Sequence, residues 1–234
     1  MAAEVVTRSA PGVEALDTPH CVPEITRATL SDIARANTLF GGRSAVAWGV
    51  DRLLEGTAAE VHTLLDVGAG MGDVAGWLER RRHRGPALRA FALDWHLEAA
   101  RMCRERGLAS VQGDAFRLPL ADRSIDVVVA SQLLHHFNRA AAAQLARELT
   151  RVARVGVVVG DLRRARVAVA GIWLAALALR FHAVSRRDGV TSVRRGYTAR
   201  ELEELLHDAG IAAAVTERPG FRVVATWRVH DADG

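Results

Sequence analysis

The residues best suited to hold a ligand form a glycine-rich turn that directly follows a short apolar segment, 61–67. In Asp66-Val-Gly-Ala-Gly-Met-Gly72 the glycines stand at alternate positions. Glycine lets the chain turn sharply and brings its backbone against a ligand. The helix expected next points its N-terminus into the same crevice. The turn therefore predicts a nucleotide-like ligand. It does not identify that ligand, because Gly70-Met-Gly-Asp-Val-Ala75 also fits the dinucleotide pattern Gly-x-Gly-x-x-Ala.

Three acidic residues, one after another along the chain, stand at or after the ends of expected apolar segments. Asp66 stands just before the first glycine, where a carboxylate attracts a cationic amino acid group. Asp94 ends the apolar segment 87–93 and is placed to accept both hydroxyls of a ribose. Asp114 is placed to accept from an exocyclic adenine amine, with Phe116 beside the ring. Each alone is typical of a turn or a helix cap. Together they favour an adenosine ligand with a cationic end.

Two adjacent histidines are candidates for the reacting end of the site. His135 and His136 come shortly after the expected strand 124–131 and face the same crevice. Imidazole titrates in the range that a general base needs at neutral pH, although packing or helix capping would also explain them. Ser131 and Gln132 lie closer to the strand end, where contact with the ligand and a packing role are equally expected.

These residues require a sheet whose strand ends meet along one edge. Continuous apolar strands alternate with helices through the middle of the chain, which predicts a parallel sheet covered on both faces. The expected strands are 61–67, 87–93, 124–131 and 155–160, and the expected helices are about 74–82, 97–106 and 138–153. A capping box at Thr198–Glu201 starts a last helix, which Gly210 ends. Two further strands, 211–216 and 221–229, flank a turn at Pro219-Gly220.

The expected fold is therefore α/β: a Rossmann-like, doubly wound, mostly parallel sheet that ends in an antiparallel hairpin. Residues 1–22 are expected to be a loose arm, and apolar spacing predicts helices at 23–40 and 44–54. We assign residues 1–56 to an arm with lid helices and residues 57–234 to the main domain. Within that domain, 161–197 is an insertion that forms part of an acceptor pocket.

The uncharged segment 167–179 is too short to span a bilayer. It is predicted to be a buried helix or a pocket wall, with peripheral membrane contact as the weaker alternative. Arg195 and Tyr197 follow it and are weaker candidates for the same pocket.

Composition excludes several functions. All 31 basic residues of the 234 are arginine, so Schiff-base lysines and P-loop lysines are ruled out. The net charge of +4 is modest and the arginines are scattered, which favours a solvated surface over a nucleic-acid interface. Cys21 and Cys103 are too few for a disulfide framework or a cysteine metal site, and no metal is expected. No signal sequence is apparent, so a cytoplasmic location is expected.

Residues 61–160 resemble the core of the class I S-adenosylmethionine-dependent methyltransferases, in particular their small-molecule ubiquinone/menaquinone-type (methyltransferase type 11-like) branch. The matching motifs are Leu65–Gly72, Asp94, Gly113–Asp122 and Asp126–Phe137. Residues 161–234 also resemble bacterial methyltransferases associated with polyketide pathways. The resemblance implies a seven-stranded sheet with S-adenosylmethionine as cofactor. It places Asp66 and the glycines at the methionine end, Asp94 at the ribose, and Asp114 and Ala115 at the adenine. The expected cofactor-binding residues are Asp66, Gly68, Ala69, Gly70, Gly72, Asp94, Trp95, Asp114, Ala115, Phe116, Ser131 and Gln132.

The reaction implied is an in-line displacement, in which the protein mainly aligns the nucleophile and excludes water. His135 and His136 are its catalytic candidates. The apolar cover predicts an apolar or aromatic small-molecule acceptor, with O-methylation of a phenolic or polyketide-like compound in secondary metabolism as the leading hypothesis. C-methylation of a quinone-type precursor is an alternative.

Three other functions are rivals. An NAD(P)-dependent oxidoreductase would explain neither Asp114 nor the hairpin, and without lysine the tyrosine–lysine dehydrogenase pair is excluded. A nucleic-acid methyltransferase is disfavoured because Ser-Gln-Leu-Leu-His-His136 stands where an Asn/Asp-Pro-Pro-Tyr motif would grip a base. The third is a non-catalytic binding protein that kept the methyltransferase fold. We expect no nucleic-acid partner and no membrane span, and a homodimer is left open.

Overall fold

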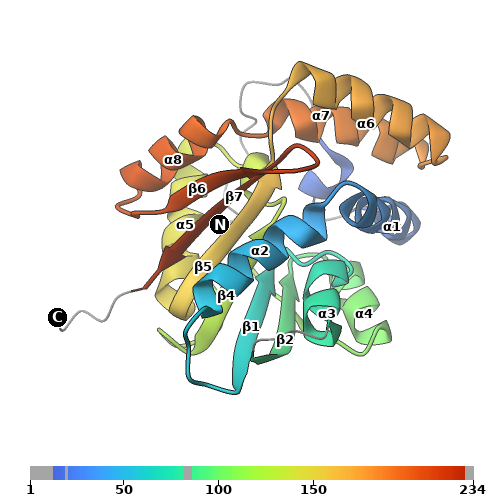
Figure 1. Ribbon diagram of the computed structural model, residues 1–234. Coiled ribbons are helices and arrows are strands. Elements are labelled where there is room, and N and C mark those ends of the chain that lie inside the picture. Colours follow the sequence, from blue (N-terminus) through green and yellow to red (C-terminus); the bar gives the residue numbers. More distant parts are fainter. Residues whose placement is uncertain (1–12, 19–20, 82–85, 230–234) are drawn as a thin grey trace.

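The computed structural model describes residues 13–18, 21–81 and 86–229. A seven-stranded sheet in the order β3-β2-β1-β4-β5-β7-β6 forms its centre (Figure 1). The strands are β1 Val61–Val67, β2 Ala87–Asp94, β3 Ala109–Gln112, β4 Ile125–Ser131, β5 Ala153–Leu162, β6 Ala214–Arg218 and β7 Arg222–Arg228. Strands β1 to β5 pair in parallel, and β7 is antiparallel to both β5 and β6. The predicted doubly wound sheet with a terminal hairpin is confirmed.

Helices cover both faces of the sheet, which explains why the central strands are continuously apolar. On one face α2 (Gly42–Leu54), α3 (Asp73–Arg80) and α4 (Leu97–Glu105) contribute Val50, Leu78 and Cys103 to one buried cluster. On the other face α5 (Arg139–Val152) and α8 (Ala199–Asp208) bury leucines such as Leu145 and Leu205. Both helices start at predicted caps: the Asn138 side chain accepts from the Ala141 N–H, and Thr198 and Glu201 form a capping box.

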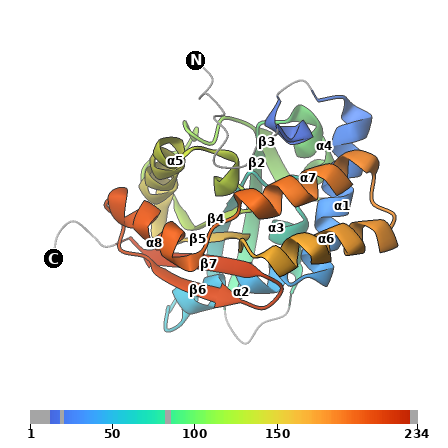
Figure 2. The same ribbon diagram turned by 90° about the horizontal axis from the view of Figure 1, so that it is seen from above.

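Strands β1 and β4 are neighbours, and the sheet is built outward from them in opposite directions. Sheets of this type bind ligands in the crevice at the carboxyl ends of such strands. Three helices cover that edge: α1 (Pro23–Leu39), α6 (Arg166–Ala178) and α7 (Ala183–Arg195). Figure 2, which looks down on this edge, shows α6 and α7 lying side by side across it. Of the two helices predicted to form a lid, α1 covers this edge together with the α6–α7 pair. Helix α2 instead packs mainly on the sheet.

Two elements were not anticipated from the sequence. Strand β3 is a short edge strand with mostly exposed side chains, so it lacks the apolar run that marked the other strands. Helix α7 contains four arginines and Gly189, which obscure its helical period.

The prediction of a loose arm at residues 1–22 was wrong for its last part. Ala15–Asp17 form a single 3₁₀ turn, η1, in which Glu14 and Asp17 are buried. Two hydrogen bonds close this turn, because the Glu14 N–H donates to the Asp17 carboxylate and the Asp17 N–H to the Glu14 carbonyl. The arm's first twelve residues and residues 19–20 lie outside the described residues.

The expectation for segment 167–179 was half right. It forms helix α6, and its residue Ile172 does line a cavity. However, the opposite side of α6 is exposed, with Trp173 and Leu174 more than half accessible to solvent. Within the described residues, no helix is long and apolar enough to cross a bilayer.

Candidate active site

A cavity of about 580 Å³ opens at the carboxyl edge of the sheet. Its wall contains every predicted cofactor-binding and catalytic residue except Gly72. These residues are Asp66, Gly68, Ala69, Gly70, Asp94, Trp95, Asp114, Ala115, Phe116, Ser131, Gln132, His135 and His136. Side chains from α1, η1, α6 and α7 complete the wall. The structure therefore brings the acidic, glycine and histidine positions, far apart in the sequence, around one space.

The glycine turn is fixed by close packing. The N–H groups of Gly68 and Ala69 both donate to the Leu93 carbonyl, at 2.8 and 3.1 Å, which ties the turn to the end of β2. Gly68 has a φ of 70°, and a Cβ there would lie 2.8 Å from a methyl group of Leu133. No other residue fits both conditions. Gly72 serves packing instead of the cavity, since a Cβ there would meet Leu108 at 2.7 Å.

Asp66 is the unusual residue of the turn. It is buried, and its Oδ1 atom has no hydrogen-bond partner among the described residues. Burial raises the pKa of the Asp66 carboxyl well above its ordinary value, and the charge of Asp73 raises it further. A cationic ligand group beside Oδ1 would reverse this shift. The residue therefore fits the role of binding an ammonium group.

Asp94 is placed at the end of β2 as predicted, but its oxygens already have protein partners. Oδ2 accepts from the Gly70 N–H at 2.8 Å, and Oδ1 accepts from the His96 N–H at 2.9 Å. Asp94 therefore orients the glycine turn. Burial raises its pKa, and these hydrogen bonds oppose that effect. Each carboxylate oxygen keeps a second lone pair, so acceptance from ligand hydroxyls remains available.

The far end of the cavity is lined by aromatic side chains and one exposed carboxylate. Asp114 is exposed, and its Oδ1 accepts from the Phe116 N–H at 2.9 Å, which shapes the loop after β3. The Phe116 and Phe137 rings meet edge to face with centroids 5.0 Å apart. Trp95, about one-third exposed, contributes a second ring to the wall. This end is suited to a flat, polar-edged ring such as a purine.

Gln132, at the end of β4, adopts a backbone conformation that non-glycine residues avoid, with a φ of 54°. Two interactions hold it there: its N–H donates to the Gly160 carbonyl at 2.7 Å, and its Nε2 donates to Asn37 of α1. Strain of this kind, typically ~1–3 kcal/mol, occurs where a site demands one geometry. Here it sets the position of Leu133 over the glycine turn and links β4 to the covering helix.

His135 is held by a carboxylate at the end of β5. Its Nδ1 lies 2.6 Å from Oδ1 of the buried Asp161, and its N–H also donates to Asp161. Burial opposes ionisation of Asp161, but the charge and hydrogen bond of His135 outweigh it and lower the Asp161 pKa. The second ring nitrogen, Nε2, is buried and has no partner within the described structure. This arrangement orients an imidazole whose free nitrogen is available to a ligand.

His136 belongs to a second, more strongly charged cluster. Its Nδ1 lies 2.6 Å from Oδ1 of Asp17, and Asp17 also accepts from the buried Arg195 at 2.9 Å. Burial lowers the His136 pKa, but the charges of Glu14 and Asp17 outweigh it, so the net shift is upward. Burial likewise opposes ionisation of Asp17, yet the hydrogen bond from His136 and its further partners bring the Asp17 pKa to about 2. The cluster thus favours a charged His136.

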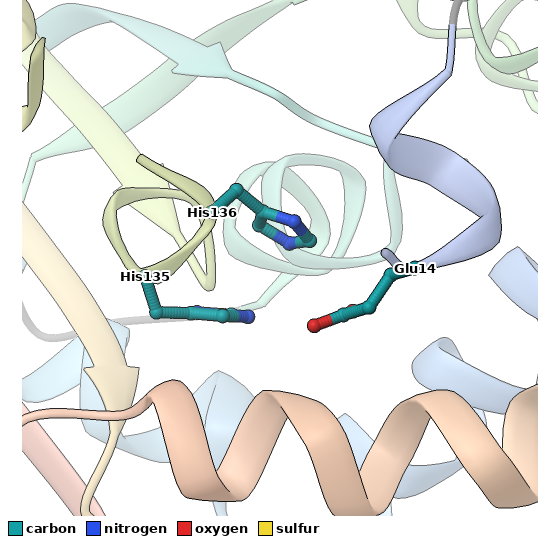
Figure 3. Close-up of side chains that lie close together, drawn as sticks. All are labelled: Glu14, His135 and His136. Carbon is teal, nitrogen blue, oxygen red and sulfur yellow. The ribbon is translucent and has the colours of Figure 1, made fainter. Parts of the chain in front are cut away.

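Glu14, His135 and His136 point into one space, from η1 and from the 3₁₀ turn η2 (Leu134–His136) (Figure 3). One ligand atom of each lies within 4.8 Å of the others, and these residue types can bind a divalent metal. However, both oxygens of Glu14 already accept hydrogen bonds, from Arg195 at 3.1 Å and from Ser192 at 2.7 Å. The charge of Arg195 opposes a second cation beside it. The group is better suited to hold protons than a metal ion.

Four site residues were missed by the sequence analysis. Asp161 was seen only as part of a segment after a strand, and Glu14 and Asp17 fell in the supposed arm. Glu14 and Asp17 stand three positions apart, and this spacing of acidic residues is too common in helix caps to have identified them. Arg222 at the start of β7 is buried in the cavity wall, and its Nη1 has no partner among described residues. Burial lowers the Arg222 pKa to about 10. It can face an anionic ligand group.

The two weaker candidates from the insertion have structural roles. Arg195 is buried behind the cavity wall, where it holds Glu14 and Asp17. The Tyr197 hydroxyl donates to the Leu134 carbonyl at 3.0 Å and so fixes the turn that carries both histidines. Neither lines the cavity. Their effect on the site is indirect.

Known proteins resemble this core in sequence and in fold. Residues 65–159 match a family model described as a methyltransferase domain. A demethylmenaquinone methyltransferase of Roseiflexus sp. (strain RS-1) is 36% identical over 110 residues, which cover 44% of this chain and 42% of that protein. One of Porphyromonas gingivalis is 30% identical over 118 residues, which cover 44% and 45% of the two chains. The match thus covers less than half the length of either relative.

Solved structures extend the likeness to most of the chain. An S-adenosylmethionine-dependent methyltransferase from Aquifex aeolicus superposes with a TM-score of 0.60 at 18% identity, covering 89% of this chain and 99% of that one. A magnesium protoporphyrin IX methyltransferase from Synechocystis, solved with bound S-adenosylhomocysteine, gives 0.56 at 14% identity and covers 85% and 84%. At these identities the likeness shows a shared fold.

Proposed function

We propose that this chain is a class I methyltransferase that methylates a hydroxyl of a small aromatic or apolar molecule with S-adenosylmethionine. The methyltransferase-domain match at residues 65–159 and the shared fold support this proposal. One observation carries the proposal. A single cavity joins a buried carboxylate at the glycine turn, one oxygen of which has no partner among the described residues, with a buried imidazole that a second carboxylate orients. The first suits a cationic cofactor, and the second suits an acceptor that must lose a proton.

The residues of the cavity fit S-adenosylmethionine along its length. Oδ1 of Asp66 is available to its ammonium group, and the turn at Gly68 lets the backbone come close to it. The remaining lone pairs of Asp94 are available to the ribose hydroxyls. Phe116 and Trp95 offer ring contacts, and Asp114 offers an acceptor for the adenine amine. When bound, the cofactor supplies a sulfonium methyl group already activated for in-line displacement.

The acceptor compartment lies on the side of the cavity that β5, α6 and α7 cover. Leu162, Ile172, Phe181 and Val193 line it and give it an apolar surface. His135 and His136 form its polar wall. A flat or alkyl-bearing acceptor fits such a surface. A hydrogen bond between its hydroxyl and the histidines would orient the acceptor in the compartment.

We assign the two histidines different roles in the proton step. Nε2 of His135 takes the hydroxyl proton, and Asp161 at Nδ1 stabilises the imidazolium that forms. The acceptor oxygen would then carry the electron pair that forms the new bond to the methyl carbon, while the bond from that carbon to sulfur breaks and S-adenosylhomocysteine leaves with its electron pair. His136, whose raised pKa favours the charged form, stabilises the developing oxyanion.

The names of the sequence relatives support a second candidate: methylation of a ring carbon in a quinone-type precursor. The same base would serve it, because removing a phenolic proton makes the adjacent ring carbon nucleophilic. The two candidates differ in the product alone.

The test is methyl transfer from ¹³C-methyl-labelled S-adenosylmethionine to a panel of phenols and hydroquinones. We expect labelled product that is unchanged in amount when EDTA is present. The carbon chemical shift then distinguishes an O-methyl from a C-methyl product. Label accepted only by amines would refute the acceptor class, and activity abolished by EDTA and restored by a divalent metal would refute the base mechanism.

A further inference from the structure

Helix α6 presents an apolar face to solvent. Its exposed residues other than Arg166 are all apolar or glycine. The large ones are Val167, Trp173, Leu174 and Leu177, which are 70%, 55%, 58% and 52% exposed. Positions 167, 170, 174 and 177 share one side of the helix at the i, i+3, i+7 and i+10 spacing. These exposed side chains therefore form a stripe along the helix. Figure 1 shows α6 at the periphery of the fold.

The opposite side of α6 packs against the rest of the protein. Ala168 and Ala176 are buried, and Ile172 lines the cavity. Small residues on the inner side let α6 pack closely on α7, where Gly189 comes near Ile172. The large apolar side chains are thus concentrated on the side that faces away from the protein. Apolar patches of this kind on a soluble surface mark an interaction site.

The exposed charged residues of α6 and α7 are all arginine, although Arg163 and Arg164 before α6 pair with Glu217 and Glu201. From residue 163 to residue 195 the sequence contains eight arginines and one acidic residue, Asp188, whose side chain is buried. Arg166 begins α6, Arg180 follows its end, and Arg186, Arg187 and Arg194 are exposed on α7. In the part of the chain that the structure describes, none of these five forms an ion pair. Their charges are available to a partner.

We propose that the outer face of α6 docks on an anionic lipid bilayer. Trp173, Leu174 and Leu177 enter the interface between headgroups and acyl chains, and the arginines at both ends of the helix contact lipid phosphates. A second copy of the chain fits less well, because a two-fold contact would bring the same arginines against each other without acidic partners. An apolar face flanked by exposed arginines that form no ion pair among the described residues matches an anionic lipid surface.

The docked face lies next to the cavity. Ile172 on α6 and Phe181 just after it line the acceptor compartment, one residue away from the exposed Trp173 and Arg180. Docking would place this side of the compartment close to the membrane, where an apolar acceptor accumulates. This consequence rests on the proposed function, whereas docking itself does not.

The test is sedimentation of the full chain with sucrose-loaded vesicles of phosphatidylcholine, with or without phosphatidylglycerol. We expect binding at least tenfold tighter to the anionic vesicles, weakened by 0.5 M salt. Replacing Trp173, Leu174 and Leu177 together by serine should abolish it. The double change Arg166→Gln and Arg180→Gln should weaken it about 25-fold, roughly fivefold for each arginine.

Two matched controls lie away from α6. Val61→Ser removes a similarly exposed apolar residue at the amino end of β1, and Arg200→Gln removes an exposed arginine of α8. Both should bind vesicles as the original chain does. Binding to neither vesicle, or equal weakening by the controls, would overturn the proposal. So would a dimer in light scattering that the triple serine variant converts to a monomer, because a second copy would then cover the face. Methyl transfer to a water-soluble phenol tests the proposed function separately.

Discussion

Among the buried side-chain atoms of the cavity wall that have no hydrogen bond to any described residue, two lie where the proposed reaction needs them: Oδ1 of Asp66 and Nε2 of His135. Buried polar atoms in native proteins nearly always have a partner. An unpaired one costs about 1–3 kcal/mol. Both atoms border the same cavity, so we infer that a ligand supplies the missing partners at both ends.

The base role of His135 predicts a selective loss of turnover. His135→Gln should lower kcat by about 10²–10⁴, the usual contribution of a general base. Asp161→Asn should lower it in the same direction, because the imidazole loses the carboxylate that orients it. The affinity for S-adenosylhomocysteine, measured by calorimetry, should stay within about twofold. His207→Gln on the exposed side of α8 is the control. Full activity of the His135 variant would contradict the assignment.

Asp66 predicts opposite effects on stability and on binding. Its raised pKa means that the folded protein without ligand disfavours the carboxylate, so at pH 7 the ionised form costs stability. Asp66→Asn should therefore unfold in urea at the same or a higher midpoint, because it removes a buried unpaired charge. The same variant should lose affinity for S-adenosylhomocysteine. A large drop in stability without ligand would mean that Asp66 has a structural partner.

At the scale of elements, the site depends on the contact between η1, η2 and α7. Arg195 of α7 holds Glu14 and Asp17, and Asp17 holds His136 of η2. Ala15 adds a hydrogen bond from its N–H to Asp188 of α7. Three segments that are distant in sequence are thus joined by buried charges around the histidines.

Removing the central cation should loosen this contact. Arg195→Met leaves two carboxylates without their buried partner, and breaking a buried ion pair in this way costs about 3–5 kcal/mol. Urea unfolding measures the loss, and faster amide exchange at residues 14–17 locates it. Arg200→Met, on the exposed side of α8, should change stability by no more than about 0.5 kcal/mol. Equal effects of the two variants would contradict the role of Arg195.

The pair Asp17–His136 predicts a stability window in pH. The folded pKa of Asp17 is lowered to about 2, so its contribution is present above about pH 4 and is lost as pH falls towards 2. The pKa of His136 is raised, so its contribution is complete below about pH 6.5 and is lost as pH rises through the raised pKa.

The measurement compares the original chain with the double variant Asp17→Asn and His136→Gln. The difference in unfolding free energy should be largest between about pH 4 and 6.5, with about 2 kcal/mol of it from Asp17. Glu203→Gln on α8 is the control. A difference that does not change with pH would show that the pair is not ionised in the folded protein.

How well an element could be predicted depended on where its stabilisation comes from. Strands β1 and β4 are mostly buried, so each contains adjacent apolar residues, Leu64-Leu65 and Val127–Ala130, that mark it as a strand in the sequence. Strand β3 is held by pairing with β2 at the sheet edge, and its sequence carries no such run. The Glu14–Asp17 turn is stabilised by α7, almost 180 residues away, and local sequence contains no sign of that contact.

At the scale of the whole molecule, one half of the site is marked by local sequence motifs, and the other half is formed by contacts between distant segments. The half that we propose for the cofactor is built by strand ends and their adjoining turns, so local motifs located Asp66, Asp94 and Asp114 together. The half that we propose for the acceptor is assembled from η1, α6, α7 and the end of β5, which meet only in the folded chain. His135 and His136 were located by their position after β4, but Asp161 and Asp17, which orient them, needed the structure.

We infer that the cavity binds an adenosyl sulfonium cofactor through the carboxylate of Asp66. Calorimetric titration with S-adenosylhomocysteine, with NAD as competitor, tests it most directly. We predict one site per chain for S-adenosylhomocysteine, no binding of NAD, and an affinity at least tenfold weaker for Asp66→Asn, as expected for a lost charge-assisted hydrogen bond. No binding of S-adenosylhomocysteine by the original chain, or equal binding by the Asp66 variant, would contradict it.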